Sequence, residues 1–173
     1  MPKKIELTTW YFEMHAPPER QAAVAPEGLE IVRAVEPPIH FYRDLYDTIG
    51  SPWVWWERKR QSDAQVLAEI HAPGVELWVP YFQGVPVGMS EIDFRKDGEA
   101  FVAYFGILPE YCGRGWGRYL IDWTIGHAFA RGVGRLWLHT CSLDSPAAVR
   151  TYTAAGFTQY DVKIEWIDDP AAG

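Results

Sequence analysis

The sequence is poor in the features that mark secreted, membrane-spanning and metal-binding proteins. It contains only two cysteines, Cys112 and Cys141, which are too few for a disulfide scaffold and form no metal-binding pattern. No run of about 18 apolar residues is present, so we expect no transmembrane helix and no membrane partner. The first residues, Met-Pro-Lys-Lys-Ile-Glu-Leu, lack the apolar region of a signal peptide. Together these absences predict a cytoplasmic protein without a metal site.

Basic residues are also scarce. Lysine and arginine total 16 against 23 acidic residues, which gives a formal net charge of −7, and the basic residues are scattered. A nucleic-acid-binding surface usually needs a basic patch, so we expect no nucleic-acid partner. Hydrophobic residues, by contrast, make up 48% of the 173 residues and aromatic residues 15%. This composition is sufficient for one globular domain with a substantial core.

Glycines are concentrated where an apolar strand meets an apolar helix. The apolar strand at 101–108 stops at Pro109, and glycines then occupy every second position, at Gly113, Gly115 and Gly117. Glycines allow successive backbone N–H groups to turn toward one point. A new helix adds its free first-turn N–H groups and the positive end of its dipole. The junction therefore predicts an anion site, and a diphosphate suits it.

Two arginines, Arg114 and Arg118, can add charge-assisted contacts to such a diphosphate. The segment does not match two familiar phosphate loops. The dinucleotide-binding fingerprint requires a third glycine where Arg118 stands, and the P-loop requires a lysine that is absent nearby. Cys112 is not expected to act as a nucleophile, because no histidine or aspartate stands beside it in the sequence.

The loop resembles the coenzyme A loop of the GNAT superfamily of N-acyltransferases, whose signature is Gln/Arg-x-x-Gly-x-Gly/Ala. Gly115 and Gly117 match the two small positions, and Cys112 replaces the usual Gln or Arg. A second segment resembles the later motif of this family, Asn/Asp-x-Pro, then Ala, then Tyr-x-x-x-Gly-Phe. Its matching residues here are Asp144, Pro146, Ala148, Tyr152, Gly156 and Phe157.

The predicted elements follow the order of the GNAT fold. Alternation and apolar spacing predict strands at 5–14, 29–35, 75–82, 85–94, 99–108, 135–140 and 158–166. Helices are expected at 39–49, from Ser62 or Asp63 to Ile70, at 116–131 and at 144–155. Ser145 is the expected N-cap of the last helix, and Gly156 its end. We therefore expect an α/β fold with a central mixed sheet and helices on both faces.

The resemblance also divides the chain into three parts. They are an N-terminal strand and connector at 1–28, a GNAT domain at 29–166 and a C-terminal tail at 167–173. The first 14 residues lie outside the resemblance. No internal linker indicates a second domain.

The resemblance implies acetyl-CoA as the acyl donor. In this family the strand before the loop separates from the next strand at a bulge, which exposes main-chain groups to the pantetheine arm and the thioester oxygen. The implied coenzyme A contacts are Phe105, Gly106, Ile107, Cys112, Gly113, Arg114, Gly115, Trp116, Gly117, Arg118, Asp144 and Tyr152. Tyr152 also resembles the family's tyrosine that protonates the leaving thiolate. The alternative is that Tyr152 is a core aromatic residue packed with Val149.

A general base is needed to remove a proton from the attacking amine. Glu91 is the candidate, because it lies between apolar residues of a predicted strand, where desolvation would raise its pKa toward neutrality. The alternation of that strand equally allows Glu91 to lie on a solvent-exposed face. Glu99, His139 and a water chain are the other candidates.

Three tryptophans, Trp53, Trp55 and Trp56, lie between the first two predicted helices. In GNAT proteins this connection helps to wall the acceptor site, so the rings can stack on a cationic amine or cover an acyl chain. Alternatively, the rings cap the core or form a contact in a homodimer. The acceptor implied by the resemblance is a small-molecule or peptide amine.

The residues and the resemblance together predict an N-acetyltransferase that transfers an acetyl group from acetyl-CoA to a primary amine by direct attack in a ternary complex. A non-catalytic acyl-CoA-binding or sensor protein on the same fold is the alternative, since Cys112 departs from the signature and several residues compete for the role of base. A sheet-based interaction module with an incidental glycine-rich turn is the third class.

Overall fold

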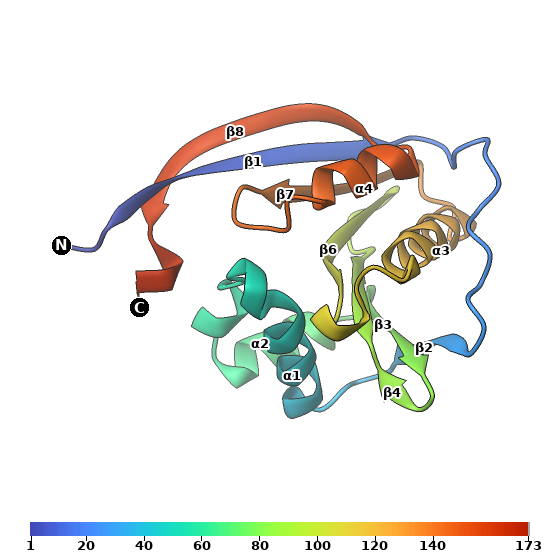
Figure 1. Cartoon of the computed structure of the whole chain (residues 1–173), viewed down its shortest axis with the longest axis horizontal. Coiled ribbons are helices and arrows are strands. Elements are labelled where there is room, and N and C mark those ends of the chain that lie inside the picture. The colour runs from blue at the N-terminus through green and yellow to red at the C-terminus, as the bar shows by residue number, and fades with distance from the viewer. Residues whose placement is uncertain (173) are drawn as a thin grey trace.

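The computed structural model describes residues 1–172 as one mixed sheet with helices on both faces (Figure 1). The strands are β1 Lys4–Met14, β2 Leu29–Ala34, β3 Val75–Phe82, β4 Val85–Pro86, β5 Gly88–Asp93, β6 Glu99–Ile107, β7 Arg135–Cys141 and β8 Thr158–Asp168. Their order is β2-β3-β5-β6-β7-β1-β8, with β4 paired to β3. Neighbouring strands are antiparallel except β6 and β7, which run parallel. The predicted fold class is confirmed.

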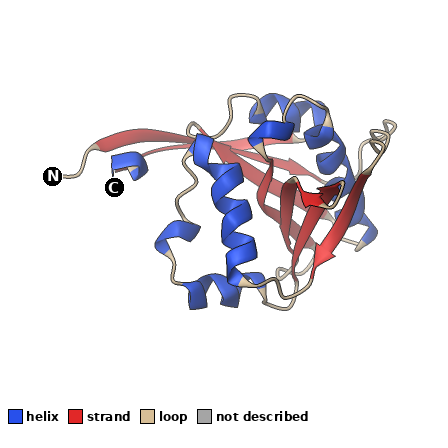
Figure 2. Cartoon of the chain, turned by 60° about the horizontal axis from the view of Figure 1, so that its bottom comes forward, coloured by secondary structure: helices blue, strands red, loops and turns tan. Residues whose placement is uncertain are grey.

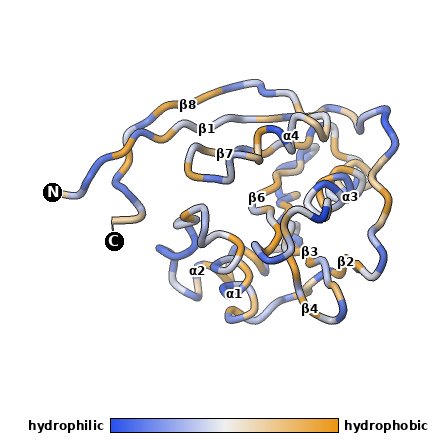
Figure 3. Tube along the Cα trace, in the orientation of Figure 1, coloured by the Kyte–Doolittle hydropathy of each residue, from blue (hydrophilic) through white to orange (hydrophobic). Residues whose placement is uncertain are grey.

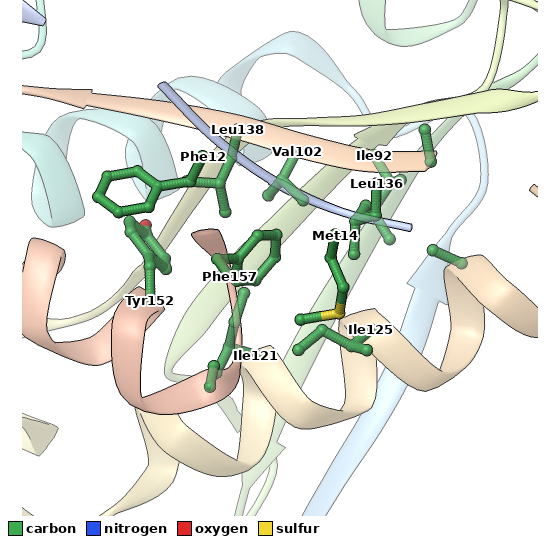
Figure 4. Close-up of a cluster of buried hydrophobic side chains, with 13 residues drawn as sticks. Phe12, Met14, Ile92, Val102, Ile121, Ile125, Leu136, Leu138, Tyr152 and Phe157 are labelled. Carbon is green, nitrogen blue, oxygen red and sulfur yellow. The ribbon is translucent and has the colours of Figure 1, made fainter. Parts of the chain in front are cut away.

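The α-helices cover opposite faces of the sheet and enclose two cores. They are α1 Ile39–Gly50, α2 Asp63–Ile70, α3 Trp116–Ala130 and α4 Ala148–Ala155. Helices α1 and α2 pack on one face, in a core that includes Met89 of β5. Helices α3 and α4 pack on the other face around Ile92 of the same strand, where Tyr152 and Phe12 also lie (Figure 4). Strand β5 is therefore buried on both faces, which explains why its sequence does not alternate cleanly.

Local sequence signals explain how several elements begin and end. Ser62 accepts a hydrogen bond from the backbone N–H of Gln65, whose side chain accepts one from the Ser62 N–H, so α2 begins with a capping box. Helix α4 ends at Gly156, whose φ of +111° suits glycine. Among residues 1–172, no helix is both long enough and apolar enough to cross a membrane.

Strand β1 lies inside the sheet, although it precedes the segment that resembles the family. It pairs with β7 through residues 9–14 and with β8 over most of its length. Residues 4–8 of β1 and 164–168 of β8 extend beyond β7 as a two-stranded ribbon, which we call the arm (Figures 1 and 2). The connector after β1 is held on α3, because Arg20 donates to the buried carboxylate of Asp122 at 2.9 Å.

Two predicted elements differ from the structure. The strand predicted at 85–94 is divided into β4 and β5, because Pro86, which faces Tyr81 of β3, has no N–H group with which to continue the ladder. The helix predicted from Asp144 begins only at Ala148, and Ser145 is not its N-cap. The Ser145 hydroxyl instead accepts from the Ala147 N–H inside a turn that precedes the helix.

Candidate functional site

The parallel strands β6 and β7 are paired for only three positions and then separate. Their pairing runs from Glu99 opposite Arg135 to Phe101 opposite Trp137, while both strands continue further. The separation begins beside a bulge in β6, where the register with β5 shifts at Ala103. A pocket of about 320 Å³ opens between the two strands and is lined by residues 102–107 and 138–141.

The glycine-rich loop lies between the end of β6 and the start of α3. Gly113 and Gly115 have φ values of +83° and +81°, and a Cβ atom added to either would meet no atom within 4 Å. Open space therefore faces both glycines. Gly115 is the N-cap of α3 and supplies no side-chain cap, so the first-turn N–H groups have no side-chain partner in the described chain. These features fit the anionic diphosphate of coenzyme A.

The two arginines of the loop have different surroundings. Arg118 donates to the carbonyl of Ala154 at 3.1 Å and lies 3.5 Å from Asp122, so its guanidinium is directed toward α4. Arg114 has no carboxylate partner among residues 1–172, and its guanidinium lies over the rings of Tyr111 and Trp116. Arg114 is therefore the more available of the two cations.

The remaining residues of the loop contact the end of β6, the core or the pocket. The Cys112 thiol donates to the carbonyl of Leu108 at 3.5 Å, and the cysteine lines the pocket. The Trp116 side chain is buried against Phe82. Gly117 has ordinary helical geometry and lines the pocket, where a Cβ atom would lie 3.7 Å from Ile107. Gly117 therefore leaves room for a ligand close to the backbone of α3.

Tyr152 extends from α4 into the pocket. Its ring packs against Phe12 and Phe157 (Figure 4) and also against Phe105. Its hydroxyl group makes no hydrogen bond with residues 1–172. Burial raises the pKa of Tyr152 above its usual value, and the negative charge of Asp144 raises it further. The phenol is therefore protonated and able to donate.

Asp144 connects the loop after β7 to the tryptophan cluster. Its Oδ2 atom accepts from the Thr140 hydroxyl at 2.8 Å and from the Cys141 N–H at 2.9 Å. Its Oδ1 atom accepts from Trp55 Nε1 at 3.2 Å. All three tryptophans of the cluster line the pocket. Asp144 thus holds the two walls of the pocket together, a role that its spacing in the sequence did not indicate.

A second pocket of about 260 Å³ lies beside the first. The residues common to both pockets are Glu57, Ala103, Tyr104 and His139. The two pockets therefore meet at the bulge of β6. Glu57 is exposed, accepts a hydrogen bond from the Tyr46 hydroxyl at 3.4 Å and has no ion-pair partner in the described residues. It was not predicted from the sequence as a site residue. Its position just after the tryptophan cluster was the only available signal.

Glu91 lines the second pocket but is only 1% exposed. Its Oε1 atom accepts from the Tyr42 hydroxyl at 2.5 Å, and its Oε2 atom accepts from Arg58 Nη2 at 2.9 Å. Burial raises the pKa of Glu91, although Arg58 and Tyr42 act in the opposite direction. Glu91 therefore lies in a low-dielectric setting, which is one of the two placements that the sequence left open, and both its oxygen atoms already accept hydrogen bonds.

His139 on β7 faces both pockets. Its ring packs against Phe101 and Tyr11, with ring centroids 5.5 and 5.6 Å away. His139 is exposed to solvent by surface area, but the aromatic rings around it desolvate part of the imidazole and lower its pKa from 6.5, while the charges of Glu57 and Asp144 oppose this effect. The imidazole is therefore neutral near pH 7 and able to accept a proton. Glu99, at the far end of β6, pairs with Arg135 and lies outside both pockets.

The structure brings together most residues that the sequence named. The predicted contacts that line the first pocket are Phe105, Gly106, Ile107, Cys112, Gly117, Asp144 and Tyr152. Gly113, Arg114 and Gly115 lie in the adjoining loop, whereas Arg118 is directed away from it. Leu7 and Thr9 of β1 also line the pocket and were not predicted. Only the pairing of β1 with β7 brings them there.

The parallel strands that separate over a pocket and the glycine-rich loop before α3 are the features that the resemblance to an acyltransferase fold implied. The model of the Acetyltransferase (GNAT) family matches residues 39–157. The chain therefore belongs to this family. No curated protein sequence matches the chain.

Solved structures share the fold at low sequence identity. A GCN5-related N-acetyltransferase from Sphaerobacter thermophilus has a TM-score of 0.69 at 19% identity, covering 97% of this chain and 52% of that chain. One from Kribbella flavida has a TM-score of 0.64 at 18% identity, covering 94% and 58%. An aminoglycoside N-acetyltransferase in complex with CoA has a TM-score of 0.59 at 20% identity, covering 80% and 94%. The chain spans between 52% and 64% of the first four matching structures.

Proposed function

We propose that the protein is an N-acetyltransferase that uses acetyl-CoA and acetylates a primary amine by direct attack in a ternary complex. The observation that supports this proposal is the meeting of two pockets at the bulge of β6, beside Ala103 and Tyr104. A donor in the first pocket and an acceptor in the second would come together there without a covalent enzyme intermediate. The family supports acetyl transfer in general, and the neighbour that binds CoA supports the choice of donor.

On the donor side, the loop N–H groups around Gly113 and Gly115 and the guanidinium of Arg114 would hold the diphosphate. Main-chain groups of residues 105–107 would hold the pantetheine arm along β6. Acetyl-CoA supplies an activated thioester. Tyr152 would donate a proton to the sulfur as the bond between carbon and sulfur breaks.

On the acceptor side, the neutral amine nitrogen forms the new bond to the carbonyl carbon and loses one proton as the amide forms. An amine that arrives as a cation first gives up its additional proton to solvent. We assign proton removal to His139, because its neutral ring opens onto both pockets. Glu91, the base named from the sequence, is the competing assignment, and both its oxygen atoms already accept hydrogen bonds. The Glu57 carboxylate, which has no cationic partner among residues 1–172, would attract the cationic form of the amine.

Release of free thiol from acetyl-CoA in the presence of a panel of primary amines tests the proposal. We expect thiol release that depends on the amine, together with a thermal shift on addition of coenzyme A. A thermal shift without thiol release for any amine would favour a non-catalytic acyl-CoA-binding protein. The absence of both would contradict the assignment of the first pocket to coenzyme A.

A further inference from the structure

A row of exposed apolar side chains lies on one face of β8, in the arm and just before it. Val162, Ile164 and Trp166 are 48%, 61% and 66% exposed. They alternate along the strand and therefore point to the same face of the sheet. Figure 3 shows hydrophobic segments along both strands of the arm. Exposed apolar residues that are scattered singly are common on protein surfaces, whereas a contiguous row of large ones indicates a contact surface.

The outer edge of β8 is also open. The strand is last in the sheet order and pairs only with β1 among the described strands. The Val162 N–H donates to the Asp161 side chain at 2.8 Å, so it points away from β1 and toward the open edge. Because ladder groups alternate, the N–H groups of Ile164 and Trp166 point the same way. Such an edge is a template for pairing with another strand.

We propose that β8 pairs antiparallel with β8 of a second copy of this chain, about a twofold axis at Ile164. Ile164 then faces the partner's Ile164, and Val162 faces the partner's Trp166. The apolar row becomes continuous across the two copies. On the opposite face of the sheet, Lys163 lies opposite the partner's Glu165, and the symmetry repeats this contact.

Charge and apolar pairing together favour this register over its neighbours. An axis at Lys163 would place two lysines opposite each other, and an axis at Glu165 would place two glutamates opposite each other, both of which are unfavourable. An axis at Val162 would place Lys163 opposite the partner's Asp161, but it would leave Trp166 opposite Thr158 and so break the apolar row. Lys163 and Glu165 already form an ion pair within the strand at 3.0 Å, so both side chains lie on one face. The order of these charges makes the strand complementary to itself.

The geometry of the molecule leaves room for this contact. The arm extends away from the body, and β8 forms the outer margin of the sheet (Figures 1 and 2). An interface formed mainly by two strand edges is at the small end of specific protein contacts, so we expect a reversible dimer that depends on protein concentration. This interface is separate from the pockets and does not depend on the proposed function.

Sedimentation equilibrium of the wild-type chain across a concentration series tests the proposal. We expect the mass to rise from 19.8 kDa toward twice that value. Lys163→Glu and Glu165→Lys each place like charges opposite one another, so each should weaken dimerisation by about tenfold or more. An equimolar mixture of the two variants restores opposite charges at both positions and should form a heterodimer. Lys96→Glu, which makes the same charge change between β5 and β6, is the control and should dimerise normally.

Circular dichroism establishes that each variant is folded before its mass is compared. A wild-type chain that stays monomeric at the highest concentration would overturn the proposal. A dimer that persists unchanged in both single variants would also overturn it, because another surface would then hold the copies together. Failure of the mixed variants to associate would exclude the register at Ile164.

Discussion

Trp55 Nε1 donates a hydrogen bond of 3.2 Å to Oδ1 of Asp144, which joins the connection between α1 and α2 to the loop after β7. The two residues lie on opposite walls of the pocket between β6 and β7. The Trp55 ring also packs against Tyr46 and Tyr104. This contact therefore fixes the separation of the two walls.

Trp55→Phe should remove the hydrogen bond and leave a smaller aromatic ring in place of the indole. A hydrogen bond to a charged group contributes about 1.5 kcal/mol, so we expect Tm to fall by about 3–6 °C. Trp53→Phe is the control, because Trp53 lines the same pocket and makes no side-chain hydrogen bond within residues 1–172. Thermal unfolding measures both variants. Equal Tm values in the two would mean that the contact with Asp144 adds nothing to stability.

Gly117→Val tests the coenzyme A assignment without straining the loop. Gly117 has ordinary helical φ, and its added side chain would enter the pocket beside Ile107. We expect KM for acetyl-CoA to rise more than about tenfold, a change of about 1.4 kcal/mol or more. Gly126→Val is the matched control, since Gly126 lies on α3 with open space around it. Unchanged coenzyme A affinity in a folded Gly117→Val protein would mean that coenzyme A does not bind beside Gly117.

Tyr152→Phe should leave folding and coenzyme A binding intact, because the hydroxyl bonds to none of residues 1–172. Turnover should fall by about 10²-fold, the low end for general acid catalysis, since a thiolate leaves readily. The raised pKa of Tyr152 keeps its hydroxyl protonated below about pH 10, so its ionisation should not shape the neutral range of the pH profile. Steady-state kinetics at a saturating amine concentration measures this. Turnover at the wild-type level in Tyr152→Phe would mean that Tyr152 contributes only to packing of the core.

His139→Gln should lower kcat most strongly near neutral pH. The imidazole accepts a proton only when it is neutral, and its lowered pKa keeps it neutral above about pH 6.5. The wild-type rate should therefore fall as pH decreases below that value. The variant should not show this acidic decrease in its pH–rate profile. The deficit should shrink at high pH, where free amine is abundant. His40→Gln, at an exposed position on α1, is the control.

Glu91→Gln separates the two candidate bases. If Glu91 holds Arg58 and Tyr42 in place, the rate should fall by a similar factor at every pH, and Tm should fall as well. Loss of the acidic limb in Glu91→Gln, with that limb retained in His139→Gln, would return the role of base to Glu91.

Asp122→Asn should loosen the connector after β1. The Asp122 carboxylate accepts from Arg20 and from the Ala23 N–H, and the loss of these charged contacts should cost about 2 kcal/mol near pH 7. Burial raises the pKa of Asp122, but the hydrogen bonds from Arg20 and Ala23 outweigh it and hold the pKa below 3.8. The pKa of Asp122 is lower in the folded protein than in the unfolded chain. The carboxylate therefore contributes its full stabilisation above pH 3.8, and this contribution is lost as the pH falls through the pKa of the folded protein. Urea unfolding should therefore show a smaller difference between the two proteins near pH 3 than near pH 7.

The sequence by itself determined the elements and the loop. Alternation, capping residues and glycines act between residues that are close along the chain, so Ser62 and Gly156 marked the ends of helices correctly. The same reasoning located the junction with Gly113 and Gly115 and predicted the mixed sheet with helices on both faces. Ser145 was wrongly expected to cap α4, because the turn that Asp144 closes delays the start of the helix.

Only the tertiary structure decided which groups meet in the pockets. Trp55 and Asp144 are 89 residues apart in the sequence, and Tyr42 and Glu91 are 49 apart. No periodic pattern specifies such contacts, because they depend on how whole elements pack. Strand β5 is buried on both faces, so the alternation of its sequence could not predict that Glu91 is buried. Strand β1 reaches the pocket only because it pairs between β7 and β8, and this long-range pairing is a property of the complete sheet.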